Sequence, residues 1–326
     1  MTGPIVAVCG TIRLNRHFRV HHAPANGERV VGETGMMRLG GRGANQAVAV
    51  ARSGVHAKLF GVVGDDTTGD RCLEVLRKYE VDTTNVRVIA GAHTAEVLRL
   101  NAEDGTTATV EVSDIDRLNS PIELIDELKT ANVILAQGGL FPSVTRELAN
   151  LEFGGRFVLN LTPVRGVYKD TFAHADPLIV NEVEATELLD TLAPDKGLTA
   201  ETGPVALAEA LRDYAKSVVV TFGARGCVFI DGADAEMYFQ PSSQLEVPLD
   251  NVGAGDAFVG ALAARLARGA DLHHAVRFGS AAGALATRRH GMVASFGDAE
   301  QVEELAAELP PAVLVTDDTD LHRAQR

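Results

Sequence analysis

Residues 250–260 read DNVGAGDAFVG, a glycine-rich turn that leads directly into an apolar helical pattern. The spacing of Phe258 and Leu262 predicts a helix over residues 253–268. The first amides of a helix have no partners within the helix and lie at the positive end of its dipole, so this turn is suited to hold an anion. Asp256 is either a base that removes a proton from a substrate or a cap of the helix, and this stretch alone leaves both interpretations open.

A second glycine-rich stretch lies near the start of the chain. Residues 40–47 read GGRGANQA and also run from glycines into a helix, which Gly54 closes. Taken together, the two stretches resemble the two signature motifs of the ribokinase (PfkB-type) family of carbohydrate kinases, whose usual forms are GGKGANQA early in the chain and DTTGAGDAF later. Either motif alone is moderately specific, but both motifs in this order and at this separation make a close match.

The composition fits a globular enzyme. The chain has 326 residues, 46% of them hydrophobic, enough for a sizeable core in one large α/β domain or two modest ones. With 44 acidic and 30 basic residues the net charge is −14, so we expect no nucleic-acid partner. Cys9, Cys72 and Cys227 lie in apolar contexts without metal-ligand spacing, which indicates reduced core residues of a cytoplasmic protein. No apolar run is long enough for a signal peptide or a membrane span, so no membrane partner is expected.

Strand and helix patterns alternate along most of the chain. Such alternation predicts an α/β fold with a mostly parallel central sheet, helices on both of its faces and a ligand at the carboxyl ends of the strands. The expected strands cover residues 4–10, 57–64, 132–136, 156–160, 177–180, 217–221 and 227–230. The expected helices cover residues 44–53, 67–80, 121–129 after Ser120, 253–268, 272–289 and 299–308, the last with Asp298 and Gln301 as a capping box.

Two segments, residues 11–39 and 94–112, interrupt the alternation with strand-like pieces and no helix. In the ribokinase family these positions supply a small β-sheet lid over the sugar site. The resemblance therefore implies a ribokinase-like three-layer sandwich with a lid, as a single domain over residues 1–326. Residues 312–326 have no counterpart in the resemblance and are expected to form a flexible tail.

The lid is also expected to mediate a homodimer, as it does in many ribokinases. Its first segment carries more apolar surface than a small flap can cover alone. The apolar residues concerned are Leu14, Phe18, Val20, Val30, Val31, Met36 and Met37.

The resemblance assigns phosphoryl transfer to the turn at residues 253–256. Such transfer needs a positioned hydroxyl, a group that takes its proton, and amides or cations around the phosphoryl group. The family's catalytic aspartate occupies the place of Asp256, which implies that Asp256 is the general base. The backbone N–H groups of Gly253, Ala254 and Gly255 would then form an anion hole, with ATP as the phosphoryl donor. Glycine at two of these places lets the backbone approach a phosphate without a Cβ clash.

The implied sugar site departs from that of ribokinase itself. Ribokinases carry G-S-x-N-x-D after the first strand, and here Arg13 and Asn15 stand at the Asn and Asp places. Ribokinases also have a glutamate where this chain has Gly139. Loss of these hydroxyl partners argues against ribose, and Arg13 suits an anionic sugar, although the basic residues around it also suit a solvated lid face. The implied substrate contacts are Arg13, Asn15, Gly40, Gly41, Arg42, Asn45 and Asp256, with Arg42 in place of the usual lysine.

Two further elements imply the nucleotide and magnesium sites. Residues 181–184 match the family's NxxE, in which Asn181 and Glu184 would organise Mg²⁺, its waters and the phosphates; a helix N-cap is the alternative. The loop at residues 221–226 resembles the family's TLGxxG loop, and the small residues at 279–283 resemble the wall beside the adenine but also suit plain helix packing. The implied nucleotide contacts are Asn181, Thr221, Gly223, Gly226, Gly255 and Ala282.

Many relatives also hold a monovalent cation such as K⁺ next to the anion hole. The matching positions in this chain are Asp250, Ser295 and the carbonyl groups of Val252, Arg289 and Gly291. Val252 replaces the usual threonine, but a backbone carbonyl survives that change.

Competing functions can be separated by their own motifs. A Rossmann dehydrogenase would carry G-x-G-x-x-G after the first strand, where this chain has none, and the Walker A lysine and the HRD and DFG motifs of protein kinases are also missing. A nucleoside kinase of the same family is the serious alternative, although the lack of tryptophan and the four tyrosines disfavour an aromatic base pocket. A non-catalytic sugar-binding regulator would need neither Asp256 nor the anion-hole glycines. The sequence does not name the sugar.

Overall fold

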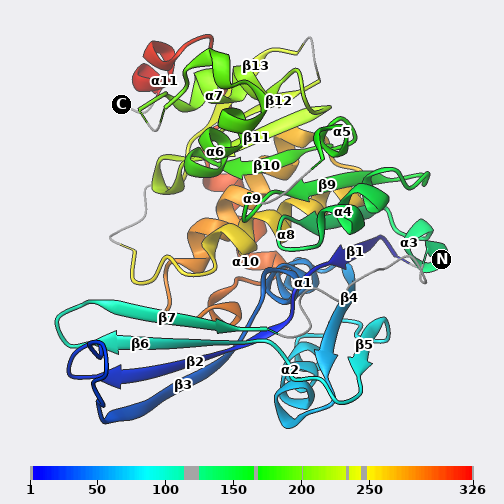
Figure 1. Cartoon of the computed structure of the whole chain (residues 1–326). Coiled ribbons are helices and arrows are strands. Elements are labelled where there is room, and N and C mark those ends of the chain that lie inside the picture. Colours follow the sequence, from blue (N-terminus) through cyan, green and yellow to red (C-terminus); the bar gives the residue numbers. More distant parts are fainter. Residues whose placement is uncertain are drawn as a thin grey trace.

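The computed structural model describes residues 3–113, 125–164, 168–199, 201–232, 235–243 and 248–324. The strands in this part of the chain form a ten-stranded sheet and a separate four-stranded sheet. The small sheet projects from one side of the main body (Figure 1). The predicted α/β fold with a lid is therefore confirmed.

The ten-stranded sheet has the order β14-β13-β12-β11-β10-β9-β8-β1-β4-β5. The strands from β11 to β5 in this order pair in parallel, and β12, β13 and β14 extend the other edge antiparallel. The parallel strands are β1 (Ile5–Cys9), β4 (His56–Gly64), β5 (Val86–Ile89), β8 (Val133–Gln137), β9 (Arg156–Asn160), β10 (Leu178–Asn181) and β11 (Ser217–Thr221). The antiparallel strands are β12 (Cys227–Asp231), β13 (Met237–Gln240) and β14 (Val313–Leu314).

Helices cover both faces of this sheet, which gives three layers. Alternate residues of β1 face opposite sides, because Val6 and Val8 lie in one buried cluster and Ala7 and Cys9 lie in the other. The Val6 side is covered by α1 (Arg42–Arg52), α2 (Thr67–Lys78), α8 (Ala254–Ala267) and α9 (Leu272–Ala286), and α10 (Ala299–Glu308) packs on α9. The opposite side is covered by α3 (Ile125–Lys129), α4 (Pro142–Ala149), α5 (Lys169–Phe172), α6 (Glu182–Leu192) and α7 (Pro204–Leu211).

The predicted elements differ from the observed ones mainly at their ends. The helix predicted at 44–53 begins at Arg42, and the helix predicted at 272–289 ends at Ala286. Asp298 and Gln301 form the predicted capping box of α10. Ser120 and Pro121, predicted to begin a helix, lie outside the described residues.

Helices α1 and α8 pack closely because α8 carries a glycine at their contact. A Cβ at Gly260 would lie 2.5 Å from the Cβ of Ala49 and 2.6 Å from the carbonyl oxygen of Gln46. Side chains do not tolerate contacts this short, so glycine is what lets the two helix backbones approach. The approach places Asn45 and Gln46 of α1 within hydrogen-bond distance of Asp256 on α8.

The four-stranded sheet has the order β3-β2-β6-β7 and forms the predicted lid. Its strands are β2 (Arg13–Val20), β3 (Gly32–Gly40), β6 (Glu96–Ala102) and β7 (Thr107–Val112). The first two lie within residues 13–40 and the other two within residues 96–112, close to the predicted segments 11–39 and 94–112. In Figure 1 these blue and cyan strands extend away from the main sheet.

The structure does not agree with the prediction of a flexible C-terminal tail. β14 pairs antiparallel with β13, and α11 (Asp318–Ala324) packs on α7. Val315 and Leu321 are only 2% and 1% exposed, and the carboxylate of Asp318 accepts a hydrogen bond from the backbone N–H of Val205. The physical reason is that the tail pairs with β13 of the central sheet and buries its own apolar residues.

The three cysteines are buried free thiols, as predicted. Burial raises the pKa of each thiol, so the thiols of Cys9, Cys72 and Cys227 stay protonated at neutral pH. They therefore contribute packing rather than nucleophilic chemistry. None of the helices within the described ranges has the length and apolar character that crossing a membrane would require.

Candidate active site

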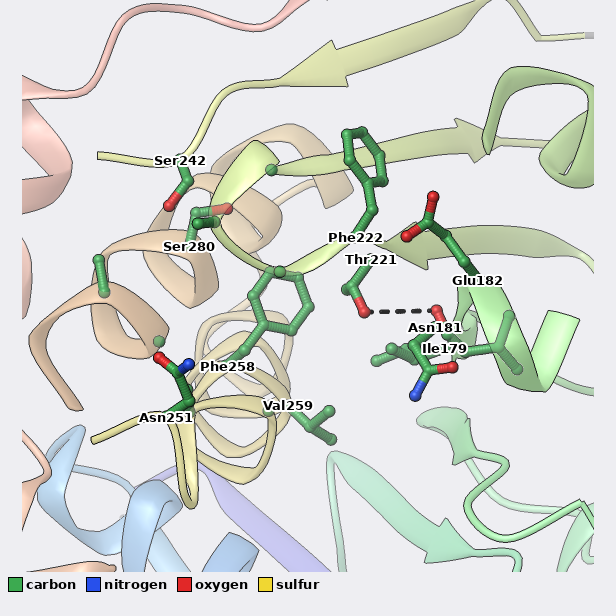
Figure 2. A pocket seen from close by; sticks show the side chains of 18 of the residues that line it. Ile179, Asn181, Glu182, Thr221, Phe222, Ser242, Asn251, Phe258, Val259 and Ser280 are labelled. Atoms are coloured by element: carbon green, nitrogen blue, oxygen red, sulfur yellow. Dashed lines mark hydrogen bonds between the residues drawn. The ribbon is translucent and has the colours of Figure 1, made fainter. Parts of the chain in front are cut away.

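A cavity of about 630 Å³ opens at the carboxyl ends of β9, β10 and β11. This edge is where parallel α/β sheets bind ligands, as the sequence predicts. Figure 2 shows Asn181 and Thr221 at the ends of two of these strands, with Phe258 and Asn251 contributed by α8 and by the turn before it. Ser280 of α9 lies on a further wall (Figure 2).

Asp256 lies in the first turn of α8 and is buried, with 7% of its surface exposed. Its Oδ2 accepts a hydrogen bond from the side-chain amide of Asn45 at 2.8 Å, and its Oδ1 accepts one from Gln46 at 3.0 Å. The guanidinium of Arg42 lies 3.7 Å from Oδ1. Burial raises the pKa of Asp256, and the Arg42 charge and the two amide hydrogen bonds oppose this rise. Because the N-cap of α8 is Gly253, Asp256 is directed toward α1 rather than used as a cap.

The turn before α8 has a geometry suited to an anion. Gly253 is the N-cap with φ of 87°, in the left-handed region that favours glycine. Ala254 and Gly255 are the first helical residues, and the backbone N–H groups at the start of a helix have no carbonyl partner in a preceding turn. The N–H of Ala254 makes one long hydrogen bond, 3.4 Å, to the carbonyl oxygen of Asn251. Ala254 and Gly255 both line the cavity, and a Cβ at Gly255 would meet no other atom within 4 Å. The backbone of this turn therefore borders open space.

Glycines also shape the side of the site formed by β3 and α1. Gly41 is the N-cap of α1 with φ of 88°, and a Cβ there would lie 2.4 Å from the carbonyl oxygen of Thr11. A Cβ at Gly40 would lie 2.6 Å from the side-chain amide of Asn15. Among the predicted substrate residues, Gly40 therefore packs against Asn15, and Gly41 packs against the backbone of Thr11, one turn before Asn45.

Arg13 has a carboxylate partner within the lid. Its guanidinium forms an ion pair with Glu111 of β7, across the intervening strand β6. An anionic group of a substrate would therefore compete with Glu111 for Arg13. This ion pair makes Arg13 less available to an anionic sugar than the sequence predicts.

Most of the predicted nucleotide contacts line the cavity. These are Asn181, Thr221, Gly223, Gly226 and Gly255. The exception is Ala282, which is buried among apolar residues of α8, α9 and α10. The face of α9 that reaches the cavity consists of Ser280, Gly283, Ala284 and Thr287, at the spacing of one helix face. Ala282 points away from this face and does not line the cavity, which does not agree with its prediction as a nucleotide contact.

Asn181 and Glu184 form a capping box at the start of α6. Asn181 Oδ1 accepts the backbone N–H of Glu184, and Glu184 Oε2 accepts the backbone N–H of Asn181, both at 2.9 Å. The predicted N-cap alternative is thus confirmed, and both residues also line the cavity. Because the cap uses Oε2, the other oxygen of Glu184 is a candidate acceptor for a water bound to Mg²⁺. Across the described residues, no group of three or more Asp, Glu, His or Cys side chains is arranged to ligate a metal directly.

The residues predicted to hold a monovalent cation fall into two groups. Asp250 accepts the backbone N–H groups of Val252 at 3.0 Å and Gly291 at 3.2 Å, so these three lie together. Arg289 and Ser295 instead line a second cavity between α9 and α10, and the Ser295 hydroxyl donates to a backbone carbonyl at 2.8 Å. The carboxylate of Asp250 is occupied by backbone donors in this arrangement.

Several residues of the site received no role from the sequence. Gln46 lies within the second motif and donates to Asp256, and Asn160 lines the cavity and accepts from Gln46. A usable signal was present, because polar residues end consecutive parallel strands: Gln137 on β8, Asn160 on β9, Asn181 on β10 and Thr221 on β11. Loop residues such as Ser242 carry no comparable signal.

This arrangement belongs to an α/β phosphotransferase whose acceptor is a hydroxyl group, and comparison with known proteins identifies its family. The profile of the pfkB family of carbohydrate kinases matches residues 6–298. The chain therefore belongs to the pfkB family of carbohydrate kinases, as the two motifs predicted.

Proteins similar to this chain match it over most of its length. The ribokinase of Bacillus subtilis is 27% identical over 304 residues, which cover 92% of this chain and 98% of that protein. The crystal structure of ribokinase from Thermotoga maritima has a TM-score of 0.83 and 26% identity, covering 93% of this chain and 99% of that one. Arabidopsis thaliana ribokinase, solved in complex with ribose and ATP, shares the fold with a TM-score of 0.85 at 23% identity, covering 94% and 99% of the two chains.

Proposed function

We propose that the protein transfers the γ-phosphoryl group of ATP to a hydroxyl group of a small carbohydrate, in a reaction that depends on Mg²⁺. The observation that carries this proposal is the position of Asp256, a buried carboxylate directly beside the glycine turn at Gly255. An acceptor hydroxyl at the carboxylate and a phosphoryl group at the turn would lie next to each other. The similarity to ribokinases of known sequence supports a sugar as the acceptor.

Asp256 would act as the general base. Its two oxygens accept amide hydrogens from Asn45 and Gln46, which favour the charged form and leave lone pairs for the proton of the acceptor. As the acceptor oxygen attacks, the new bond forms to the γ-phosphorus and the bond to the bridging oxygen of ADP breaks. The proton moves to Asp256, and the electron pair of the broken bond leaves with ADP.

The charge of the transferring phosphoryl group would be met by two elements of this chain. The amides of Gly253, Ala254 and Gly255 lie at the positive end of α8, and Ala254 and Gly255 line the cavity. Arg42 lines the same cavity and lies 3.7 Å from Asp256, so its guanidinium is placed between the base and the phosphate space. Arginine is suited to this task because it stays charged and donates in a fixed fork.

The residues at the start of α6 fit magnesium held through water. The capping box fixes Asn181 and Glu184 at the cavity wall, and one oxygen of Glu184 remains for a bound water. When bound, Mg²⁺ would neutralise charge on the ATP phosphates. Direct coordination would then come from phosphate oxygens and water rather than from a cluster of side chains.

An acceptor screen tests this function. We expect release of ADP that depends on the acceptor, for at least one member of a panel of pentoses, hexoses, sugar acids, sugar phosphates and nucleosides. The release should stop when EDTA removes Mg²⁺ and resume when Mg²⁺ is restored. Folded protein that shows no acceptor-dependent release across the panel would contradict the proposal, and a preference for nucleosides would favour the nucleoside-kinase alternative.

We further propose that the lid sheet mediates a homodimer. Val110 and Val112 of β7 are 56% and 46% exposed, and Met36 and Met37 of β3 are 60% and 40% exposed. Val110 lies in one cross-strand row with Leu98, Arg16 and Met37, so Val110, Val112 and Met37 share one face of the sheet and Met36 lies on the other. A second copy would offer the same apolar residues in return, as a two-fold interface requires.

Light scattering at micromolar protein concentration tests the dimer. We expect twice the mass of one chain for the wild type and a monomer for the double variant Val110→Lys, Val112→Lys. The matched control is Val88→Lys, because Val88 is 54% exposed on β5, outside the lid. A wild-type monomer, or a control variant that dissociates equally, would contradict the proposed interface.

A further inference from the structure

A chain of buried amide side chains leads from the central sheet to Asp256. Gln137 ends β8, Asn160 ends β9, and Gln46 lies on α1 between them and Asp256. Gln46 is fully buried, Gln137 is 1% exposed and Asn160 is 6% exposed. Buried amides are costly unless they are hydrogen-bonded, so a chain of this kind needs a role that offsets the cost.

The two ends of the chain determine the orientation of every amide in it. Asn160 donates to the carbonyl oxygen of Ile179 at 3.2 Å, and a carbonyl can only accept, so the Asn160 oxygen is left to face Gln46. The ionised carboxylate of Asp256 also can only accept. The amide nitrogen of Gln46 must therefore face both, and it donates to Asn160 at 2.9 Å and to Asp256 at 3.0 Å.

The remaining atom of the Gln46 amide is held from the third side. Its oxygen accepts a hydrogen bond from the amide nitrogen of Gln137 at 2.8 Å. Gln46 thus uses both amide hydrogens and its oxygen, and it cannot turn without losing all three bonds. Gly10 makes room for this arrangement, because a Cβ there would lie 1.7 Å from the side-chain oxygen of Gln137.

Asn45, the other donor to Asp256, is held less firmly. Its amide nitrogen donates to Asp256, but its buried side-chain oxygen has no hydrogen-bond partner in the described part of the chain. Turning the Asn45 amide would break one hydrogen bond, whereas turning the Gln46 amide would break three. The orientation of the Asp256 carboxylate is therefore set mainly by Gln46.

We propose that Gln46 is a positioning residue that orients the Asp256 carboxylate as a proton acceptor, and that Gln137 and Asn160 hold Gln46 in its donating orientation. This inference rests on the proposed function, because it assigns Gln46 to the base of that reaction. Gln46 acts through Asp256 and needs no contact with the substrate. Its loss should change both the pH range in which Asp256 can accept a proton and the rate of the reaction.

The groups around Asp256 determine the sign of that change. Of the elements packed on α8, α1 supplies the charged group that faces the carboxylate, Arg42. The other titratable groups of these elements contact other partners. Arg52 and Arg277 donate to the backbone carbonyls of Phe296 and Leu309, and Arg156 pairs with Asp176. His273 packs on Phe229, His274 pairs with Asp271, and Cys9 lies in the core on the opposite side of the sheet. Removal of the Gln46 donor raises the pKa of Asp256 further above its usual range, since burial already raises it. The base is then protonated, and inactive, up to a higher pH.

The experiment compares the pH dependence of kcat/KM for wild type, Gln46→Leu and Gln46→Glu. For Gln46→Leu we expect the acid limb to move up by about one to two pH units, the value of one hydrogen bond to a charged group. Gln46→Glu keeps the size of the side chain but makes two carboxyl groups share a proton, so its acid limb should move up at least as far. Gln137→Leu should move the limb in the same direction by less, and in each variant kcat should fall more than KM rises.

The matched control is Gln240→Leu. Gln240, at the end of β13, is 1% exposed and donates to the backbone carbonyls of Pro241 and Pro310, so its loss removes a buried amide without touching Asp256. We expect it to lower stability and to leave the acid limb in place. An unmoved limb in folded Gln46→Leu and Gln46→Glu, or an equal shift in the control, would overturn the inference.

A second readout separates this inference from the proposed function. The Asp256 carboxyl can be titrated by ¹³C NMR in aspartate-labelled protein and assigned by its loss in Asp256→Asn. The titration midpoint should rise in Gln46→Leu even if the wild type showed no kinase activity, in which case only the proposed function would fail. A midpoint that does not change between wild type and Gln46→Leu would overturn the positioning role regardless of activity.

Discussion

Replacing Asp256 with asparagine should lower kcat by about 10²–10⁴-fold, the usual range for loss of a positioned general base. The KM values for ATP and for the sugar should stay close to those of the wild type, because the deficit lies in the chemical step. Asparagine keeps the size of the side chain but cannot take the proton of the acceptor. Steady-state kinetics on the acceptor found in the screen measures both parameters.

The amides around Asp256 explain why this variant should fold. Asparagine would turn an amide nitrogen toward one of the two donors that now meet the carboxylate. Asn45 can answer by turning its own amide, because its side-chain oxygen has no partner within the described structure. Gln46 is fixed by three bonds and should keep its place. A melting temperature near that of the wild type is the control, and a near-normal kcat would remove Asp256 from the mechanism.

Replacing Gly255 with alanine should separate stability from activity. A Cβ at this position meets no other atom within 4 Å, and the residue is helical, so the fold should keep its stability or gain about 0.5–1 kcal/mol. The added methyl group borders the cavity beside the first amides of α8, in the space that a phosphoryl group needs. We expect kcat/KM for ATP to fall roughly 10²-fold, as a misplacement of about 1 Å can cause.

Thermal melting and steady-state kinetics on the same preparation check the Gly255 variant. Gly154→Ala is the control for an added methyl in open space, because a Cβ at Gly154 also meets no atom within 4 Å and the residue lies away from the cavity. We expect no change of activity in the control. Wild-type activity in Gly255→Ala would mean that the phosphoryl group does not pass close to this turn.

The sequence predicted the features of the site that depend on neighbouring residues. A glycine turn and the helix after it lie within one short stretch, so the starts of α1 and α8 could be located from residues 40–47 and 250–260. The polar residues that end β8, β9, β10 and β11 share one edge of the sheet for the same local reason. Among these strand ends, the sequence predicted site roles for Asn181 and Thr221 but not for Asn160, and it predicted none for Gln46 of α1.

The remaining features depend on contacts between distant residues. Gln46 and Asp256 are 210 positions apart, and their hydrogen bond exists because Gly260 lets α1 and α8 approach. Arg13 and Glu111 are 98 positions apart and meet because β2 pairs with β6 and β6 pairs with β7. No local pattern predicts such a partner.

Two errors arose from similar causes. The sequence assigns the small residues of α9 to the nucleotide site as a group, but the packing of α9 between α8 and α10 decides which of them line the cavity, and Ala282 does not. The C-terminal segment lacks a counterpart in the family motifs, yet it pairs with β13 and buries Leu321. Both outcomes depend on tertiary packing, which local residue patterns do not specify.

The most direct test of the account is a single-turnover measurement of phosphoryl transfer at saturating ATP and acceptor, with Mg²⁺, by rapid quench and detection of the phosphate ester. The account predicts that the ester forms in one exponential phase with the wild type and at least 10²-fold more slowly with Asp256→Asn, while both proteins bind ATP alike. Equal rates of ester formation in the two proteins, or consumption of ATP without any ester, would contradict it.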